Sequence, residues 1–502
     1  MIPLPLGQVG DIELLIRARH GLIVLDAADP QRAAALFEYV ADRMRLPHFV
    51  WKDGLGLTRT APGMRPITGT ETLSGCLKHI AASTLDALYH LRGIDAHYDD
   101  APGLVRLAEL AERFMGTSSA ILLNDNDPRL PAPLAPFATL VRLAPPTPEE
   151  YFDYLQGLVK DVSSRAPISI TLTSEDMTRL LSMVQGLTYL ELKKVMTQAM
   201  LDDGVLDRDV FESVRHAKRA VIERTGVLEY FPSDERLDEV AGLDALKAWL
   251  EQRAVAFREP SRAREFGLTA PRGILLIGVQ GCGKSLCAKA VASAWQLPLL
   301  RFDPSRIFDR YVGQTEKNMA QAMRIAERMA PVILWIDELE KAFGQGDHDG
   351  GVSARLLGGF LAWMQERREG VFVIATANDI SQLPPELLRK GRFDEIFFVD
   401  LPDSEARRAI AAIHLQRRRR SPSGFDLERL AAASDGFSGA ELEQAIVSAL
   451  YACFSRHEEL TTEAILSEIA RTRPLSVTMA EKVRELRDWA RERAVAAHPF
   501  QR

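Results

Sequence analysis

The chain has 502 residues, of which 46% are hydrophobic and 26% charged, and its formal net charge is −7. These values are typical of a globular protein of about two to four domains, and the acidic balance does not favour a nucleic-acid partner. The four cysteines form no C-x-x-C pair, so neither a disulfide framework nor a zinc site is indicated. The sequence starts without a signal-peptide pattern and has no apolar run of about 18 residues, so we expect no membrane span and a cytoplasmic location.

The first elements follow a strand–loop–helix plan. Residues 11–20 have a short helical pattern, and Leu22–Leu25 is an apolar run of strand length. The loop Asp26–Pro30 then leads into a predicted helix over about residues 31–45. The same plan recurs near residue 280, but this first copy has no Gly-Lys pair in its loop.

Short motifs of the first half recur in the second half in the same order. Four pairs of segments lie about 250 residues apart: 46–51 with 297–302, 120–127 with 371–379, 137–146 with 393–402, and 186–192 with 436–442. Each match is weak alone, because short apolar motifs recur by chance. Four matches in one order at a near-constant separation predict an internal duplication.

The first copy lacks the residues that carry chemistry in the second copy. Its apolar run Ala87–Leu91 is followed by no Asp-Glu pair, and no phosphate loop precedes it. We therefore predict a nucleotide-binding-like α/β domain over residues 1–145 that binds no nucleotide. A smaller helical domain should follow over residues 146–227, opened by the proline-rich segment Pro145–Pro148.

The second copy contains a glycine-rich loop between a strand and a helix. Gly273–Ile277 is a strand-length apolar run, the segment Gly278–Ser285 has the pattern G-x-x-x-x-G-K-S, and a helical pattern begins at Leu286. Glycines allow main-chain N–H groups to surround phosphate oxygens. The predicted contacts are Gly278, Val279, Gln280, Gly281, Cys282, Gly283, Lys284, Ser285 and Leu286, with Lys284 on the β- and γ-phosphates and Ser285 on Mg²⁺. Taken alone, the motif also fits a glycine turn with a surface lysine.

A second apolar run ends in two carboxylates. Val332–Ile336 predicts a strand buried on both faces, and Asp337 and Glu338 follow it directly. Asp337 is suited to holding Mg²⁺, and Glu338 to positioning and polarising an attacking water. An isolated pair of this kind is often a solvated strand end, but downstream of a phosphate loop it indicates a nucleotide-hydrolysis site.

From Asp238 to about Leu460 the chain resembles an AAA+ ATPase of the AAA clade. The resemblance rests on the motifs above, on Thr376-Ala-Asn378, on Leu387–Asp394 and on Gly436–Ala440. It implies an adenine frame at Val240, Ala241 and Gly242, a water-orienting sensor at Asn378, a lid histidine at His414, and lid contacts at Gly439 and Ala440. It also implies that Arg389 and Arg392 reach a neighbouring subunit's nucleotide in a homo-oligomer, expected to be a six-membered ring. Without the resemblance, two arginines three apart more often pair with carboxylates or lie in solvent.

The predicted fold class is therefore α/β, with tandem AAA+-like units. Each unit should have a parallel P-loop-type sheet with flanking helices and a small helical lid, and the first unit is degenerate. The second α/β domain is expected over residues 228–402 and its lid over residues 403–502, including one amphipathic helix at Ala480–Ala497.

Two loops and one basic run bear on what such a ring acts on. Tyr311, Val312 and Gly313 match the aromatic–hydrophobic–glycine triplet that grips polypeptide in protein-threading relatives. Composition alone favours a half-buried loop residue at Tyr311, whereas the resemblance favours the pore role. The glycine-rich segment 344–351 is expected to be a mobile loop. The run Arg417–Arg420 is interpreted as a solvated helix end, because no aromatic residues interleave with it.

The whole chain most resembles a narrower group, the AAA+ ATPases known as hypothetical open reading frames in cyanobacterial and algal plastid genomes, together with their bacterial relatives. This resemblance rests on the degenerate first half, Leu228–Pro232 and the tail Thr472–Met479. It implies Mg²⁺-dependent ATP hydrolysis but names no client. The favoured hypothesis is an ATP-driven motor that remodels, unfolds or disassembles a protein client. The alternatives are an ATP-controlled assembly switch with slow hydrolysis and, less favoured, a nucleic-acid-associated ATPase.

Overall fold

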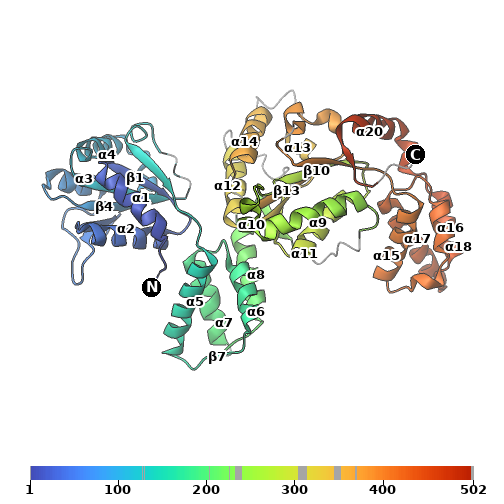
Figure 1. Cartoon of the computed structure of the whole chain (residues 1–502), viewed down its shortest axis with the longest axis horizontal. Helices are drawn as coiled ribbons and strands as arrows, with labels where there is room; N and C mark the ends of the chain where they lie inside the picture. The colour runs from blue at the N-terminus through green and yellow to red at the C-terminus, as the bar shows by residue number, and fades with distance from the viewer. Residues whose placement is uncertain are drawn as a thin grey trace. The chain divides into compact units, whose positions relative to one another are not determined.

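The computed structural model describes residues 2–126, 128, 130–202, 204–224, 226–231, 240–303, 314–343, 352–367, 370–389 and 391–498. Of residues 6, 258, 260, 261, 314, 342 and 352 it describes the backbone alone. The chain divides into two compact units, residues 1–218 and 219–502, each with its own sheet (Figure 1). Helix α8 (Val210–Glu223) runs across the boundary.

The first unit is built on a six-stranded sheet in the order β3-β2-β4-β5-β1-β6. All neighbouring strands pair in parallel except the edge strand β3, which pairs antiparallel with β2. The elements of its α/β part are α1 (Leu6–Arg17), β1 (Leu22–Asp26), α2 (Pro30–Met44), β2 (His48–Lys52), β3 (Gly56–Arg59), α3 (Leu73–Ala82), β4 (Leu88–Arg92), the 3₁₀ turn η1 (Ile94–His97), α4 (Ala101–Phe114), β5 (Ala120–Asp125) and β6 (Ala138–Arg142).

Helices cover both faces of this sheet, because successive strand residues point to opposite sides. Leu22 and Val24 of β1 pack with α3 and α4, whereas Ile23 and Leu25 pack with α1 and α2. A helical part follows the sheet. Its elements are α5 (Pro148–Ser163), β7 (Ser169–Ile170), α6 (Ser174–Val184), α7 (Tyr189–Asp202), β8 (Val205–Leu206) and α8.

The second unit is built on a seven-stranded sheet in the order β15-β14-β10-β13-β12-β11-β9. The edge strand β9 runs antiparallel to β11, and all other neighbours are parallel. Its α/β elements are β9 (Leu228–Phe231), α9 (Asp244–Arg258), α10 (Pro260–Glu265), β10 (Gly273–Gly278), α11 (Lys284–Trp295), β11 (Leu299–Phe302), α12 (Gln314–Arg328), β12 (Val332–Ile336), α13 (Leu339–Phe343), α14 (Val352–Glu366), β13 (Val371–Ala377), η4 (Ile380–Gln382), η5 (Pro385–Leu388) and β14 (Glu395–Val399).

Strand β10, in the interior of this sheet, is buried on both faces. Ile274 and Leu276 of β10 pack with α9 and α11, while Leu275 and Ile277 pack with α12, α13 and α14. The carboxyl ends of the parallel strands β10, β12 and β13 lie at one edge of the sheet, where open α/β folds bind ligands.

Five strands of the two sheets have the same order, as the predicted duplication requires. The series β6-β1-β5-β4-β2 of the first unit corresponds to β14-β10-β13-β12-β11 of the second. In both sheets an antiparallel edge strand follows in space, but β3 comes after β2 in the chain whereas β9 comes before β10. The fold class is thus confirmed: two α/β units, each with a mainly parallel sheet and a helical part.

The lid of the second unit follows β14, and its helices lie together at one side of the α/β part (Figure 1). Its elements are α15 (Ser404–Arg417), η6 (Pro422–Gly424), α16 (Leu427–Ala433), α17 (Gly439–Arg456), α18 (Thr462–Arg471) and α19 (Leu475–Thr478). The chain then returns to the α/β part, where α20 (Ala480–Arg493) packs through Leu486 and Ala490 on the core of the sheet. The predicted helix Ala480–Ala497 is wrong at its end, because the helix stops at Arg493 and β15 (Val495–Ala496) adds a strand to the sheet.

Candidate active site

The loop between β10 and α11 has the backbone of a phosphate-binding loop. Gly281 and Gly283 have φ angles of 79° and 89°, a left-handed conformation that strains other residues. Helix α11 begins at Lys284, two residues earlier than the predicted Leu286. The first N–H groups of a helix have no partner within the helix and carry the positive end of its dipole. The loop therefore delivers an anion-binding helix end next to the carboxyl edge of β10.

Lys284 lies inside this loop. The residue is only 5% exposed to solvent, and its ammonium donates hydrogen bonds of 2.8 Å to the carbonyl oxygens of Gly278 and Val279. Burial lowers the pKa of Lys284 to about 8, although the nearby carboxylates oppose the shift. The negative charge of an incoming phosphate would favour the protonated form of Lys284 and so restore its full positive charge.

Asp337, at the end of β12, faces Ser285 and Thr376. Its Oδ1 accepts hydrogen bonds from the Ser285 hydroxyl at 3.1 Å and from the Thr376 hydroxyl at 2.7 Å. A hydroxyl and a carboxylate oxygen on two adjoining elements are the hard oxygen ligands that Mg²⁺ prefers, since it keeps several waters and takes one or two protein groups. The donor set at Ser285 and Asp337 therefore fits Mg²⁺.

Glu338 is held in a strained backbone conformation. Its φ of 52° is left-handed, which costs a non-glycine residue about 1–2 kcal/mol. Its N–H donates to the Thr376 hydroxyl at 3.0 Å, and its Oε1 accepts from the Asn378 amide at 3.3 Å. Its Oε2 lies 2.5 Å from the ammonium of Lys341. In this conformation the Glu338 carboxylate contacts both Lys341 and Asn378, and Asn378 is the residue predicted to orient the attacking water with it.

Glu340 is a site residue that the sequence analysis missed. Its Oε1 accepts the main-chain N–H of Asn378 at 3.0 Å, and its side chain is buried. Burial raises the pKa of Glu340, and the hydrogen bond from Asn378 opposes that rise. Glu340 thus fixes the backbone of Asn378, and Asn378 in turn contacts Glu338. The only sequence signal for Glu340 was its position, two residues after Glu338 and close to the end of β12.

The two arginines expected to act across an interface differ in their surroundings. Arg389 is exposed at the end of η5. Arg392 is half-buried, and its Nη1 donates to the carbonyl of Leu361 at 2.6 Å. Arg389 is thus the arginine more open to a second molecule, whereas Arg392 also stabilises its own subunit.

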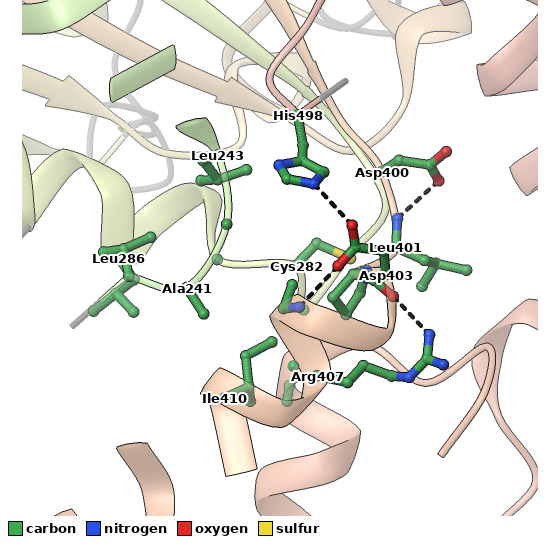
Figure 2. Close-up of a pocket in the computed structure, with 18 of the residues that line it drawn as sticks. Ala241, Leu243, Cys282, Leu286, Asp400, Leu401, Asp403, Arg407, Ile410 and His498 are labelled. Carbon is green, nitrogen blue, oxygen red and sulfur yellow. Dashed lines mark hydrogen bonds and ion pairs between the residues drawn. The ribbon is translucent and has the colours of Figure 1, made fainter. Parts of the chain in front are cut away.

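A cavity of about 770 Å³ lies between the α/β part and the lid of the second unit (Figure 2). The predicted residues that line it are Val240, Ala241, Gly242, Gly281, Cys282, Gly283, Leu286, His414, Gly439 and Ala440. Lys284, Ser285, Asp337 and Glu338 are not in its lining, so the cavity covers the part of the site that extends from residues 281–283 of the loop to the lid. Nor are Gly278, Val279 and Gln280, which lie at the end of β10 and in the loop. A cavity with both apolar and polar walls beside a glycine-rich loop suits a nucleotide base and ribose.

Two predicted lid residues, Ala440 and His414, line this cavity. The N–H of Ala440, at the start of α17, donates to the carbonyl of Gly281 at 3.1 Å, so the lid touches the phosphate loop. His414 of α15 lies with its Nδ1 3.4 Å from Oε1 of Glu443. Burial lowers the pKa of His414, and the Glu443 carboxylate opposes the shift.

The lining also contains ionisable residues that the sequence analysis did not select, among them Asp400, Asp403, Arg407, Arg487 and His498. Figure 2 shows His498 and Asp403 directed toward each other at one side of the cavity. No sequence signal identifies them, because they come from separate segments: the hinge after β14, α15, α20 and the residues after β15.

In the first unit, the turn that precedes α2 occupies the place of the phosphate loop, and its own side chains hold it. Asp29 caps α2, and its Oδ1 accepts from the main-chain N–H groups of Gln31 and Arg32 at 3.0 and 3.1 Å. Its Oδ2 accepts from the N–H of Tyr189 at 2.7 Å, at the start of α7. Helix α7 corresponds to the lid helix α17 of the second unit. In the first unit the Asp29 carboxylate therefore joins the start of α2 to the helix that corresponds to α17. Arg32 is buried and pairs with Glu150 at 2.7 Å.

Two predicted loops fall outside the described residues: Tyr311, Val312 and Gly313, and the glycine-rich segment 344–351. Among the helices within the described ranges, none is both long and apolar enough to cross a membrane.

The fold and the loop–carboxylate–sensor arrangement define a P-loop ATPase of the AAA class. A model of the ATPase family associated with various cellular activities (AAA) matches residues 274–401, and a model of the AAA+ lid domain matches residues 424–468. In the first unit, models of the N-terminal and second domains of SpoVK-like AAA ATPases match residues 9–143 and 150–225.

The chain belongs to the family of the AAA domain-containing protein ycf46. It is 34% identical over 489 residues to the uncharacterized AAA domain-containing protein ycf46 of Pyropia yezoensis, covering 96% of this chain and 97% of that protein. It is 33% identical over 487 residues to the protein of the same name from Guillardia theta, covering 96% and 94%. A further relative is the ATP-dependent zinc metalloprotease FtsH of Methylibium petroleiphilum, 35% identical over 256 residues, which cover 50% of this chain and 40% of that protein.

Proposed function

We propose that this protein binds Mg·ATP in the second unit and hydrolyses it, and that it works as a homo-oligomeric motor on a protein client. The observation that carries the proposal is the hydrogen-bonded group of Asp337, Glu338, Thr376 and Asn378 beside the phosphate loop. Membership of an AAA family supports it independently.

In this mechanism the phosphates lie along residues 278–285, with Lys284 on the β- and γ-phosphates. Ser285 and Asp337 would hold Mg²⁺, which neutralises phosphate charge when bound. Glu338 orients and polarises the attacking water, and Asn378 fixes the direction of the Glu338 carboxylate. The buried position of Lys284 strengthens its interaction with phosphate, since the local dielectric is low.

The proposal assigns Arg389 and Arg392 to a neighbouring subunit's site. Charge that gathers on the γ-phosphoryl oxygens in the transition state is stabilised by a guanidinium supplied in trans. The exposure of Arg389 supports this role for it, whereas Arg392 combines it with its own contact to Leu361. A six-membered ring is the assembly that we infer from the family.

Hydrolysis is tested by steady-state ATPase assays on the full chain. Glu338→Gln should retain nucleotide binding and lose turnover by about two orders of magnitude, since it removes only the water-activating carboxylate. Glu366→Gln, which changes an exposed carboxylate at the end of α14, is the matched control and should keep the wild-type rate. Equal loss in both variants, or turnover that survives Glu338→Gln, would contradict the proposed site.

A protein client is supported by the Tyr311–Gly313 triplet and by the relative named as an ATP-dependent protease. ATPase rates should rise with a permanently unfolded polypeptide, and Tyr311→Ala should remove that rise while preserving the basal rate. Stimulation by DNA but not by polypeptide would favour the nucleic-acid alternative. A slow rate that no polymer changes would favour the assembly switch.

The first unit, by this proposal, holds no nucleotide. The Asp29 carboxylate already occupies the α2 terminus and reaches Tyr189, so a phosphate would meet negative charge there. Equilibrium binding of ATP to the full chain should saturate at one nucleotide per chain, and Lys284→Ala should abolish it. A second nucleotide that persists in Lys284→Ala would overturn this assignment.

A further inference from the structure

The last described residues of the chain form part of the second unit's sheet. Strand β15 runs parallel to β14, with Val495 beside Phe397 and Ala496 beside Phe398. Ala497 is fully buried, and its N–H donates to the carbonyl of Phe398 at 2.9 Å. Because β15 is parallel to its neighbour, the residues that follow it lie at the ligand-binding edge of the sheet. These residues are Ala497 and then His498.

His498 joins the two walls of the cavity. Its Nε2 lies 2.8 Å from Oδ2 of Asp403, and its Nδ1 lies 3.1 Å from Oδ2 of Asp244. Asp244 begins α9, directly after the predicted adenine frame, and Asp403 precedes the first lid helix. A Cβ added to Gly242 would lie 4.0 Å from the His498 ring nitrogen, so the imidazole also borders that frame. Figure 2 shows His498 reaching across to Asp403.

Asp403 controls where the lid begins. Its Oδ1 accepts the N–H of Ala406 at 2.8 Å and so caps α15. Its Oδ2 is the atom that faces His498, so one carboxylate holds the lid helix with one oxygen and the end of the chain with the other. A second tie lies on the same hinge, where Nε of Arg487 in α20 donates to both carboxylate oxygens of Asp400 at 2.9 and 3.0 Å.

We propose that His498 is a positioning residue of the nucleotide site: it fixes α15 against the adenine frame and thereby sets the affinity for the purine nucleotide. This inference rests on the proposed ATP site. The contacts of His498 lie at the base end of the cavity, away from Lys284 and Glu338. Its loss should therefore weaken binding of both ATP and ADP and leave the chemical step unchanged.

The test measures ADP affinity by calorimetry and KM and kcat for ATP on the full chain. His498→Ala should raise Kd and KM about tenfold, the effect of losing one hydrogen bond to a charged group, with kcat within about twofold. His498→Gln, which keeps a donor in reach of Asp403, should recover most of the affinity. Arg493→Ala, an exposed change in the last turn of α20, is the control and should bind ADP like wild type.

Asp403→Asn provides a second arm, since asparagine still caps a helix but loses the carboxylate. In that background His498→Ala should add little to Kd. Wild-type Kd in His498→Ala, or a fall in kcat with KM unchanged, would overturn the inference. So would an equal loss in His498→Gln and His498→Ala, which indicates a purely structural role. If wild type binds no ADP at all, the proposed ATP site itself fails; if wild type binds and Lys284→Ala does not, only the role of His498 is in question.

Discussion

The Thr376 side chain can be replaced by one of nearly the same shape that lacks its hydroxyl, and we expect this small change to disturb the site strongly. Its hydroxyl accepts the N–H of Glu338 and donates to Oδ1 of Asp337, and the side chain is almost fully buried. Thr376→Val keeps the volume and removes both hydrogen bonds. The variant therefore separates the hydroxyl's role from packing.

The magnitude follows from those two bonds. A hydrogen bond to a carboxylate contributes about 1.5–3 kcal/mol, and an unsatisfied buried N–H costs about 1–3 kcal/mol. Release of Glu338 from its left-handed conformation returns about 1–2 kcal/mol. The net loss of unfolding free energy in the second unit should be about 3 kcal/mol, which lowers Tm by about 6–12 °C for a unit of this size.

The assay is thermal unfolding together with steady-state ATPase kinetics. In Thr376→Val, the displaced Asp337 and Glu338 should lower kcat about tenfold or more. Thr376→Ser is the matched control, since it keeps the hydroxyl and loses one methyl group, and its unfolding free energy should stay within about 1 kcal/mol of wild type. If Thr376→Val unfolds and turns over like Thr376→Ser, the hydroxyl does not hold the two carboxylates and the reasoning is refuted.

Two further predictions concern the first unit and Lys284. Glu150→Ala should destabilise the first unit by about 3 kcal/mol in denaturant unfolding, because it leaves the buried Arg32 charge uncompensated. Glu463→Ala, which removes one partner of an exposed ion pair, is the control and should cost at most about 0.5 kcal/mol. Equal losses of unfolding free energy in the two variants would contradict the role of burial. ATP affinity should be constant below pH 8 and fall about tenfold per pH unit above it, because phosphate binds protonated Lys284, whose pKa in the free protein is about 8. The same lowered pKa means that the unfolded chain holds more protons between pH 8 and 10.5, so the nucleotide-free unit gains stability over that range; a Lys284→Arg variant, charged throughout, should show neither trend.

The positions of strands β10 and β12 and the glycine-rich loop of the site were predictable because they depend on short-range patterns. The runs Gly273–Ile277 and Val332–Ile336 are apolar at every position, as strands buried on both faces require, and each leads directly into its functional residues. The weak echoes between the two halves were informative for the same reason, since three of the four fall on corresponding strands of the two sheets and the fourth falls at the starts of α7 and α17.

The residues that sequence patterns could not supply depend on long-range contacts. His498 reaches the cavity only because β15 pairs with β14, whose partner residues lie 98 positions earlier in the chain. The helical periodicity of residues 480–493 did not indicate that the helix ends at Arg493. The left-handed turn at Glu338 is held by Thr376 from a neighbouring strand. Likewise, nothing in the spacing of Arg389 and Arg392 indicates that the second of them contacts Leu361.

The central claim, an ATPase site completed by a neighbouring subunit, is tested most directly by mixing two inactive variants. Glu338→Gln cannot activate water but can offer Arg389, whereas Arg389→Ala keeps Glu338 and lacks the arginine. Each alone should have little ATPase activity, and a random equimolar mixture should recover about a quarter of the wild-type rate, since that share of sites joins an intact Glu338 to a neighbour's Arg389. A mixture that remains as inactive as its components, or an Arg389→Ala protein that is fully active alone, would contradict the account.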